Sequence, residues 1–336
     1  MKRRTLLIAT CAAAMLATGT SYAGETWRYA FEEAIDEVQG VFATRFKEHI
    51  EANSDHTVQL FPFGTLGESD DIMEQTQAGI LQFVNQSPGF TGALIPEAQV
   101  FFVPYLLPQD SAALNEFFRT SVAINEMFPE IYAEHGLELL TMYPEGEVVM
   151  TTKQPVFSPT DLNEQNIRVM TNPLLVESYR AFGAVPTPLP WGEVYGALQT
   201  NMIQGQENPM FFVESTKMYE VTDYITFTGH NNFTTALMAN KDFFDGLSDG
   251  DRQLIREAVD VAFEHILEYQ EGLTEASLDM ILASKPSMTV NVLSDEQRQP
   301  FMDASTSVEA EFLRMTGPRG AAILEQMKAD LEAVTN

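Results

Sequence analysis

Strand-like and helix-like segments alternate along this chain, and the whole series occurs twice. In the first series, residues 27–33 (WRYAFEE) and 80–86 (ILQFVNQ) have the apolar character of strands, whereas residues 38–53 carry an apolar stripe at helical spacing. The second series begins at residue 137. Strands that alternate with helices form α/β layers, because each element must bury its apolar face against another. Two such series predict an α/β fold with two lobes.

The second series repeats the pattern of the first. Residues 137–144, 147–156 and 166–170 are predicted strands. Asn172, which is followed by a proline, is a good helix start, and Gly183 is a natural helix end.

No low-complexity linker separates the two series, so the lobes are expected to exchange chain segments. We expect crossings near residues 144–148 and 232–236, which would act as hinge strands beside a ligand-binding cleft. The resulting division assigns residues 24–147 and 235–278 to lobe I, and residues 148–234 and 279–336 to lobe II.

Further helices are predicted from caps and spacing. Ser69 is a candidate cap for a helix whose first turn holds two aspartates. Helical spacing returns at residues 121–135, and a long helical region runs from about residue 248 to 284. Residues 294–297 (SDEQ) form a capping-box pattern, and residues 318–334 are helical again. A long helix after both series is expected to span the two lobes.

The first 23 residues are expected to be a signal peptide rather than part of the fold. Residues 2–4 (KRR) precede an apolar run at 5–18, and residues 21–23 (SYA) place small side chains where a signal peptidase cleaves. Cys11 lies in this segment and is the only cysteine, so the mature chain can form no disulfide. We therefore expect export to a bacterial periplasm.

The chain is strongly acidic. Its formal net charge is −29, and removal of the three cations in residues 2–4 makes this −32 for the mature chain. Such a surface repels nucleic acid, so no nucleic-acid partner is expected. It would also stay hydrated in strong brine, although an ordinary acidic periplasmic protein is the alternative.

Catalytic and metal motifs are absent from the sequence. There is no GxSxG, HExxH, GxxxxGK[ST] or GxGxxG pattern, and the five histidines have no paired metal spacing. Glu32 and Glu33 are adjacent in a predicted strand, so they are expected to point to opposite faces rather than to act as a pair. The chain is therefore predicted not to be an enzyme and to need no cofactor or metal.

Two side chains are candidates for ligand binding, although each has a simpler explanation. Arg168 lies between two apolar residues of a predicted strand, so it must reach water or an anion on the opposite face. A guanidinium suits bidentate capture of a carboxylate, but an ion pair with one of the 48 acidic residues is the alternative. Trp191 starts an amphipathic helix, where it could simply fasten that helix to a sheet.

Residues 166–209, NIRVMTNPLLVESYRAFGAVPTPLPWGEVYGALQTNMIQGQENP, resemble a signature of the extracytoplasmic solute receptors of TRAP transporters, and the similarity extends over the mature chain. The resemblance implies a two-lobed periplasmic binding protein fold, with mixed sheets, hinge strands and a long lobe-spanning helix. It also implies a receptor that closes on a small molecule and passes it to the membrane subunits of a TRAP permease. We expect the receptor to be a monomer.

Within this family, residues 56–96 and 123–147 look most like the branch that binds ectoine and hydroxyectoine. Carried over, the resemblance implies that Arg168 clamps a carboxylate and that Asn208 hydrogen-bonds the same group. Glu33 would accept N–H bonds from the delocalised cation of such a ligand. The aromatic residues that would enclose this cation are Phe90, Trp191, Phe212 and Phe233.

One departure from the family bears on the ligand. Many members that bind carboxylates have a second arginine where this chain has Glu147, and a single cationic clamp fits a zwitterion better than a dicarboxylate. Two alternatives stay open: the same receptor role for another small organic acid or amino acid, and an exported hydrolase that uses Glu33, Glu207 or a histidine.

Overall fold

The computed structural model describes residues 24–335, so the predicted signal peptide, residues 1–23, lies outside the described residues. The strands are β1 Thr26–Phe31, β2 Thr57–Phe61, β3 Phe83–Gln86, β4 Leu137–Thr152, β5 Asn166–Val169, β6 Val185–Pro188, β7 Gly205–Pro209, β8 Tyr224–Phe227, β9 Asn232–Asn240 and β10 Thr289–Val292. The α-helices are α1 Val38–Asn53, α2 Ser69–Gln77, α3 Pro88–Thr91, α4 Ser111–Thr120, α5 Phe128–Glu134, α6 Pro173–Ala181, α7 Val194–Gln199, α8 Met210–Ser215, α9 Lys241–Gly246, α10 Asp249–Tyr269, α11 Leu273–Ser284 and α12 Asp295–Thr335. Shorter helical turns are η1 Pro96–Phe102, η2 Ala123–Met127, η3 Pro159–Leu162, η4 Trp191–Glu193 and η5 Met218–Glu220.

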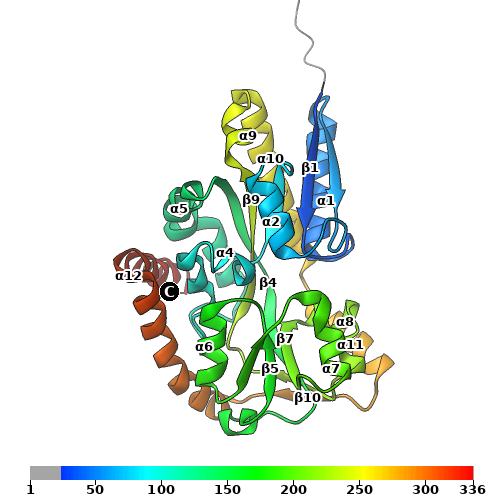
Figure 1. Ribbon diagram of the computed structural model, residues 1–336, viewed down its shortest axis with the longest axis vertical. Coiled ribbons are helices and arrows are strands. Elements are labelled where there is room, and N and C mark those ends of the chain that lie inside the picture. Colours follow the sequence, from blue (N-terminus) through cyan, green and yellow to red (C-terminus); the bar gives the residue numbers. More distant parts are fainter. Residues whose placement is uncertain (1–23, 336) are drawn as a thin grey trace, which may run out of the picture.

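The strands form mixed sheets in two halves of the molecule (Figure 1). In the upper half of that view, β1 pairs in parallel with β2 and β3, and β9 pairs antiparallel with β3 and β4. In the lower half, β5 pairs in parallel with β6 and β7, and β8 pairs in parallel with β10. The predicted α/β class with mixed sheets is confirmed.

Strand β4 joins the two halves, and here the prediction of two separate strands was wrong. Residues 137–147 pair with β9, whereas residues 148–152 pair with β7. Near Pro144 the register with β9 shifts, and Gly146 has a φ of +118°, a conformation that side chains other than glycine rarely adopt. The glycine interrupts the sequence pattern of a strand, but the backbone continues through it as one bent strand.

The predicted long helix from 248 to 284 is two helices. Helix α10 ends at Tyr269, and α11 begins at Leu273 after Gly272, whose φ of +72° cannot continue a right-handed helix. Helix α10 packs on α1 in the upper half, whereas α11 packs on α8 in the lower half. The break therefore lies where the chain passes between the halves.

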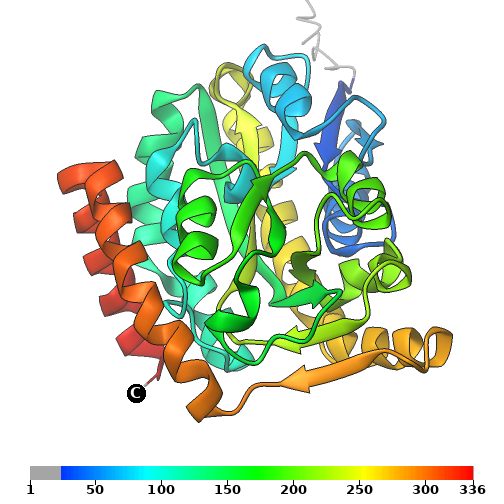
Figure 2. The same cartoon turned by 60° about the horizontal axis from the view of Figure 1, so that its bottom comes forward.

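The C-terminal helix α12 spans both halves instead. It contacts α6 of the lower half and η1 and α4 of the upper half, and Figure 2 shows it running along one side of the molecule. Ser294 and Gln297 form the predicted capping box, with Gln297 N donating to Ser294 Oγ at 3.3 Å. A kink at Gly317, with a φ of +63°, divides α12 before its last turns.

Two local predictions near the N-terminus were wrong. Strand β1 ends at Phe31, so the alternation of faces does not apply to Glu32 and Glu33. Helix α2 is capped by Glu68 rather than by Ser69, because the Glu68 carboxylate accepts from the N3 amide while Glu68 N donates to Asp71 Oδ2 at 2.9 Å. By contrast, Asn172 caps α6 as predicted and accepts from Leu175 N at 3.0 Å.

Most aromatic side chains of the described residues lie in the core. Phe42 stacks on Tyr143 with ring centroids 4.6 Å apart, which fixes α1 against β4. Tyr29 meets Phe46 edge to face at 5.4 Å. Within residues 24–335, no helix is long and apolar enough to cross a membrane.

The bend of β4 generates a stability prediction. Replacement Gly146→Ala should lower the free energy of unfolding by about 1–3 kcal/mol, because a Cβ makes a positive φ costly. Urea denaturation measures this difference. Gly250→Ala is the control, since Gly250 lies in α10 with no positive φ and alanine there should not destabilise the protein. Equal midpoints for Gly146→Ala and the wild type would show that β4 tolerates a different bend.

Candidate functional site

A partly open cavity lies among side chains from both halves of the molecule. All seven side chains predicted as a binding site line it: Glu33, Phe90, Arg168, Trp191, Asn208, Phe212 and Phe233. Seven further residues line it that the predicted set did not contain: Glu32, Gln39, Phe63, Ser69, Glu145, Met170 and Pro209.

The two halves contribute different chemistry to this cavity. The lower half supplies Arg168 from β5, Asn208 from β7 and Phe212 from α8. The upper half supplies Glu33, just beyond the end of β1, and Glu145 from β4. The cation and the amide therefore come from one half, and the acids come from the other.

Arg168 is only 2% exposed, and its charge has no acidic partner at short range. Its Nε and Nη2 atoms donate to the carbonyl oxygen of Leu189 at 3.0 and 2.9 Å. Among residues 24–335, no carboxylate oxygen lies within 4 Å of the guanidinium, so the alternative of a direct ion pair is not found. Burial lowers the pKa of Arg168 to about 10, although Glu207 opposes this shift, and the group stays cationic at neutral pH.

Aromatic rings surround the guanidinium. Its Cζ atom lies 5.4 Å from the ring centre of Trp191 and 6.0 Å from that of Phe90. Trp191 also contacts Phe212, with ring centroids 4.7 Å apart and planes tilted by 37°. The buried apolar side chains form one large cluster and a smaller one in the lower half, and Trp191 packs against both. Its side chain therefore anchors its helix and also lines the cavity. The rings keep water away from the cation, which strengthens its attraction for an anion.

Asn208 is held in place by the strand that carries it. Its Nδ2 donates to Gln206 Oε1 at 2.5 Å, and Gln206 Nε2 donates to Thr151 Oγ1 of β4 at 2.6 Å. Asn208 pairs with Val149 in the β4–β7 ladder, and its side chain lines the cavity. Gln206 and Asn208 thus form a chain of side-chain hydrogen bonds from β4 to the cavity wall.

The acidic side of the cavity is larger than the sequence indicated. Gln39 N donates to Glu33 Oε2 at 2.7 Å, and Gln39 Nε2 donates to Glu145 Oε1 at 3.1 Å. Ser87 N donates to Glu32 Oε2 at 2.8 Å. Glu32 and Glu33 thus line the same cavity, contrary to the prediction that they face apart. Glu145 stands two residues before Glu147, in a segment already singled out by its resemblance.

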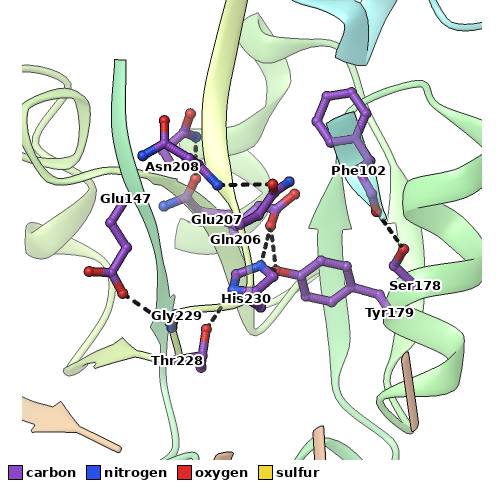
Figure 3. Close-up of polar contacts among 12 residues, drawn as sticks. Phe102, Glu147, Ser178, Tyr179, Gln206, Glu207, Asn208, Thr228, Gly229 and His230 are labelled. Atoms are coloured by element: carbon purple, nitrogen blue, oxygen red, sulfur yellow. Dashed lines mark hydrogen bonds and ion pairs between the residues drawn. The ribbon is translucent and has the colours of Figure 1, made fainter. Parts of the chain in front are cut away.

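A buried network joins Glu207, Tyr179, His230 and Thr228 (Figure 3). Glu207 Oε2 accepts from Tyr179 Oη at 2.6 Å and lies 3.0 Å from His230 Nε2, while His230 Nδ1 contacts Thr228 Oγ1 at 2.5 Å. Glu207 is thus tied to protein partners and does not line the cavity. The hydrolase alternative that used Glu207 or a histidine has no support in this arrangement.

Glu147 does not line the cavity. Its Oε1 atom accepts from Gly229 N at 3.1 Å (Figure 3). Glu147 lines a separate groove beside the α10–α11 junction. Within the described part of the chain, no group of three or more histidine, cysteine, aspartate or glutamate side chains could hold a metal ion.

The fold and the cavity define a two-lobed solute-binding protein. The family described as bacterial extracellular solute-binding protein, family 7, matches residues 30–315, and the chain belongs to this family. It is therefore a receptor for a solute and not an enzyme.

Individual relatives are more informative than the family as a whole. The chain is 67% identical to the ectoine/5-hydroxyectoine-binding periplasmic protein UehA of Ruegeria pomeroyi, over 96% of this chain and 95% of UehA. It is 59% identical to the ectoine-binding periplasmic protein TeaA of Halomonas elongata, over 98% of this chain and 96% of TeaA. The high-resolution structure of the periplasmic ectoine-binding protein from the TeaABC TRAP-transporter of Halomonas elongata superposes with a TM-score of 0.91 at 60% identity, covering 92% of this chain and 99% of that one. These relatives are periplasmic proteins, and so is this chain.

The buried acids generate a pH prediction. Burial raises the pKa of Glu32 from its ordinary value of 4.5 to about 8. Between these values the folded state holds a proton that the unfolded state has released, so the stabilising contribution is complete below pH 4.5 and is lost as the pH rises toward 8. Glu32→Gln should therefore gain stability over the wild type as the pH rises from 5 to 8, by up to about 1.4 kcal/mol per pH unit.

Urea denaturation at pH 5, 6, 7 and 8 measures this gain. The matched control is Glu74→Gln, which neutralises an exposed glutamate of α2. A constant difference between Glu32→Gln and the wild type at all four pH values would mean that Glu32 is ionised throughout.

Proposed function

We propose that this chain is the periplasmic receptor of a TRAP transporter, and that it binds ectoine or 5-hydroxyectoine and delivers it to the membrane subunits of the permease. The similarity to UehA and TeaA over nearly the whole chain supports this ligand class. The observation that carries the proposal is the buried Arg168 guanidinium, which lines the cavity with no carboxylate of residues 24–335 within 4 Å.

The ligand carboxylate would bind at the Arg168 end of the cavity. A buried cation is costly unless an anion compensates it, and a carboxylate can take two parallel N–H bonds from a guanidinium. Asn208 lines the same cavity and can hydrogen-bond the same group. Both side chains come from neighbouring strands of the lower half, so their spacing is fixed before the ligand arrives.

The cationic end of the ligand would bind beside Glu33. This carboxyl lines the cavity from the upper half, together with the ring of Phe233. Aromatic faces attract a delocalised cation by about 0.5–2 kcal/mol per contact. A zwitterion therefore matches the cavity at both ends, whereas a simple carboxylate would leave the acidic end without a partner.

Ligand binding would draw the two halves together. We propose that lobe I comprises residues 24–147 and 235–272 and that lobe II comprises residues 148–234 and 273–336, with the hinge at β4 and β9. The expected boundary at residue 278 moves to the α10–α11 break, because α11 packs on α8 of the lower half. Contacts between the halves already exist near the cavity, because Ser215 Oγ donates to Glu37 Oε1. We further propose that residues 1–23 are the signal peptide that directs export.

A thermal-shift panel tests the ligand class. Ectoine or 5-hydroxyectoine at about 100 times its dissociation constant should stabilise the folded protein by about 2.7 kcal/mol. Lactate, pyruvate and glucuronate serve as carboxylates without a cationic end. A rise in melting temperature with one of these acids, and none with ectoine, would replace the proposed ligand by another organic acid.

The role of Arg168 generates a mutational prediction. Arg168→Ala should weaken ectoine binding by about 2–5 kcal/mol, because the desolvated carboxylate loses its partner. Arg168→Lys should also bind poorly, since an ammonium cannot reproduce the planar fork of the guanidinium. Isothermal titration calorimetry measures both, with Arg180→Ala as the control because Arg180 is exposed on α6 and pairs with Glu177. Wild-type affinity in Arg168→Ala would remove this residue from the site.

A further inference from the structure

Two carboxyl groups in the cavity are held by one glutamine residue, Gln39. Gln39 donates from its backbone N to Glu33 Oε2 at 2.7 Å and from Nε2 to Glu145 Oε1 at 3.1 Å. Gln39 Nε2 also reaches Thr235 Oγ1 at 3.1 Å, which ties it to β9. Glu33 lies just beyond the end of β1 and Glu145 lies in β4, and Gln39 hydrogen-bonds both of them.

No cation compensates these acids at short range. Within residues 24–335, no nitrogen of lysine, arginine or histidine lies within 4 Å of a carboxylate oxygen of Glu33 or Glu145. Arg168 faces the same cavity from the other half. The titratable groups that act on the pair from the surrounding elements are Glu32, Glu37, Tyr143 and Tyr269. None of these four supplies a positive charge.

Gln39 holds the two carboxyl groups on the same wall of the cavity, and Glu145 Oε2 is buried there with no hydrogen-bond partner among the described residues. Two ionised carboxylates can only accept hydrogen bonds and would repel each other in this position. A single proton between them would supply the missing donor and remove the repulsion. Burial, then the charges of Glu145 and Glu37, raise the pKa of Glu33 well above its ordinary value, and burial also raises the pKa of Glu145.

We propose that Glu145 is a specificity-determining residue of the cavity: it shares one proton with Glu33 in the ligand-free protein, and this proton passes to solvent when the cationic end of a ligand binds. The inference rests on the proposed function, because it concerns the cation-binding end of that same site. Glu145 acts through Glu33 and is a positioning residue.

The shared proton explains how the cavity discriminates between ligands. A cation with N–H donors can take the place of the proton, because it supplies both the positive charge and the hydrogen bonds that the two carboxyls need. A ligand with a neutral or anionic end cannot displace it without leaving two buried like charges together. The pair therefore favours ligands with a delocalised cation, and Glu145 sets the cost of accepting anything else.

Proton release also determines whether the affinity for ectoine rises or falls with pH. When binding releases one proton, the association constant increases about tenfold for each unit by which the pH rises, as long as the free protein holds that proton. Affinity for ectoine should therefore increase from pH 5 to pH 7. A receptor whose Glu33 is already ionised would bind ectoine equally well over this range.

Calorimetry on the mature wild-type protein tests the proposal without any substitution. Ectoine is titrated at pH 6 in several buffers that differ in ionisation enthalpy, and the slope of the observed enthalpy against this quantity gives the number of protons released. We expect about one proton per ectoine bound, by the stoichiometry above. Binding with no proton release would overturn the inference and leave the proposed function intact, whereas no binding of ectoine at all would overturn both.

Two variants then assign the proton to the pair. In Glu145→Gln, the amide can donate to Glu33 and leave it ionised, so proton release and the pH dependence of affinity should both disappear. Glu147→Gln is the matched control, because Glu147 lies two residues along β4, is also partly buried and lines the separate groove rather than the cavity. It should release the same number of protons as the wild type. Unchanged proton release in Glu145→Gln would show that another group carries the proton.

Discussion

The structure depends above all on one buried positive charge. Arg168 extends from β5 into a cavity where its nearest hydrogen-bond acceptor is a backbone carbonyl, and no carboxylate of residues 24–335 approaches it within 4 Å. A desolvated guanidinium in this position is costly for the protein alone. This cost favours the binding of an anion, because the cation then gains a partner in surroundings from which aromatic rings exclude water. In an acidic chain of net charge −29, keeping one cation free of acids requires the fold itself to hold the acids away.

The acids on the opposite half complete the arrangement. Glu33 and Glu145 are bound by Gln39, whereas Arg168 is bound by the carbonyl of Leu189, so neither side needs the other in order to be fixed. A zwitterion can then connect the two halves electrostatically and draw them together. Under the proposed function, this arrangement would link binding to closure without any covalent change, as a receptor that must release its solute requires.

Several elements followed directly from the sequence, and others did not. The cap at Asn172, the box at Ser294 and Gln297, and the strand around Arg168 use contacts within a few residues, so the local pattern was sufficient to predict them. The sequence did not predict that β4 is a single strand or that residues 248–284 form two helices. In the sequence, a glycine looks the same whether its positive φ ends an element or only bends it.

The sequence by itself determined the class of the fold, the family and the group of side chains that the resemblance singled out, because alternating periodicity and short motifs are local properties of the chain. Only the tertiary structure decided which acids meet in the cavity. Glu33 and Glu145 are more than a hundred residues apart in the chain, and Gln39 brings them together through hydrogen bonds that no spacing rule predicts. Likewise, 48 acidic residues made an ion pair with Arg168 the simpler expectation, and only the packing of two halves around a cavity keeps those charges at a distance.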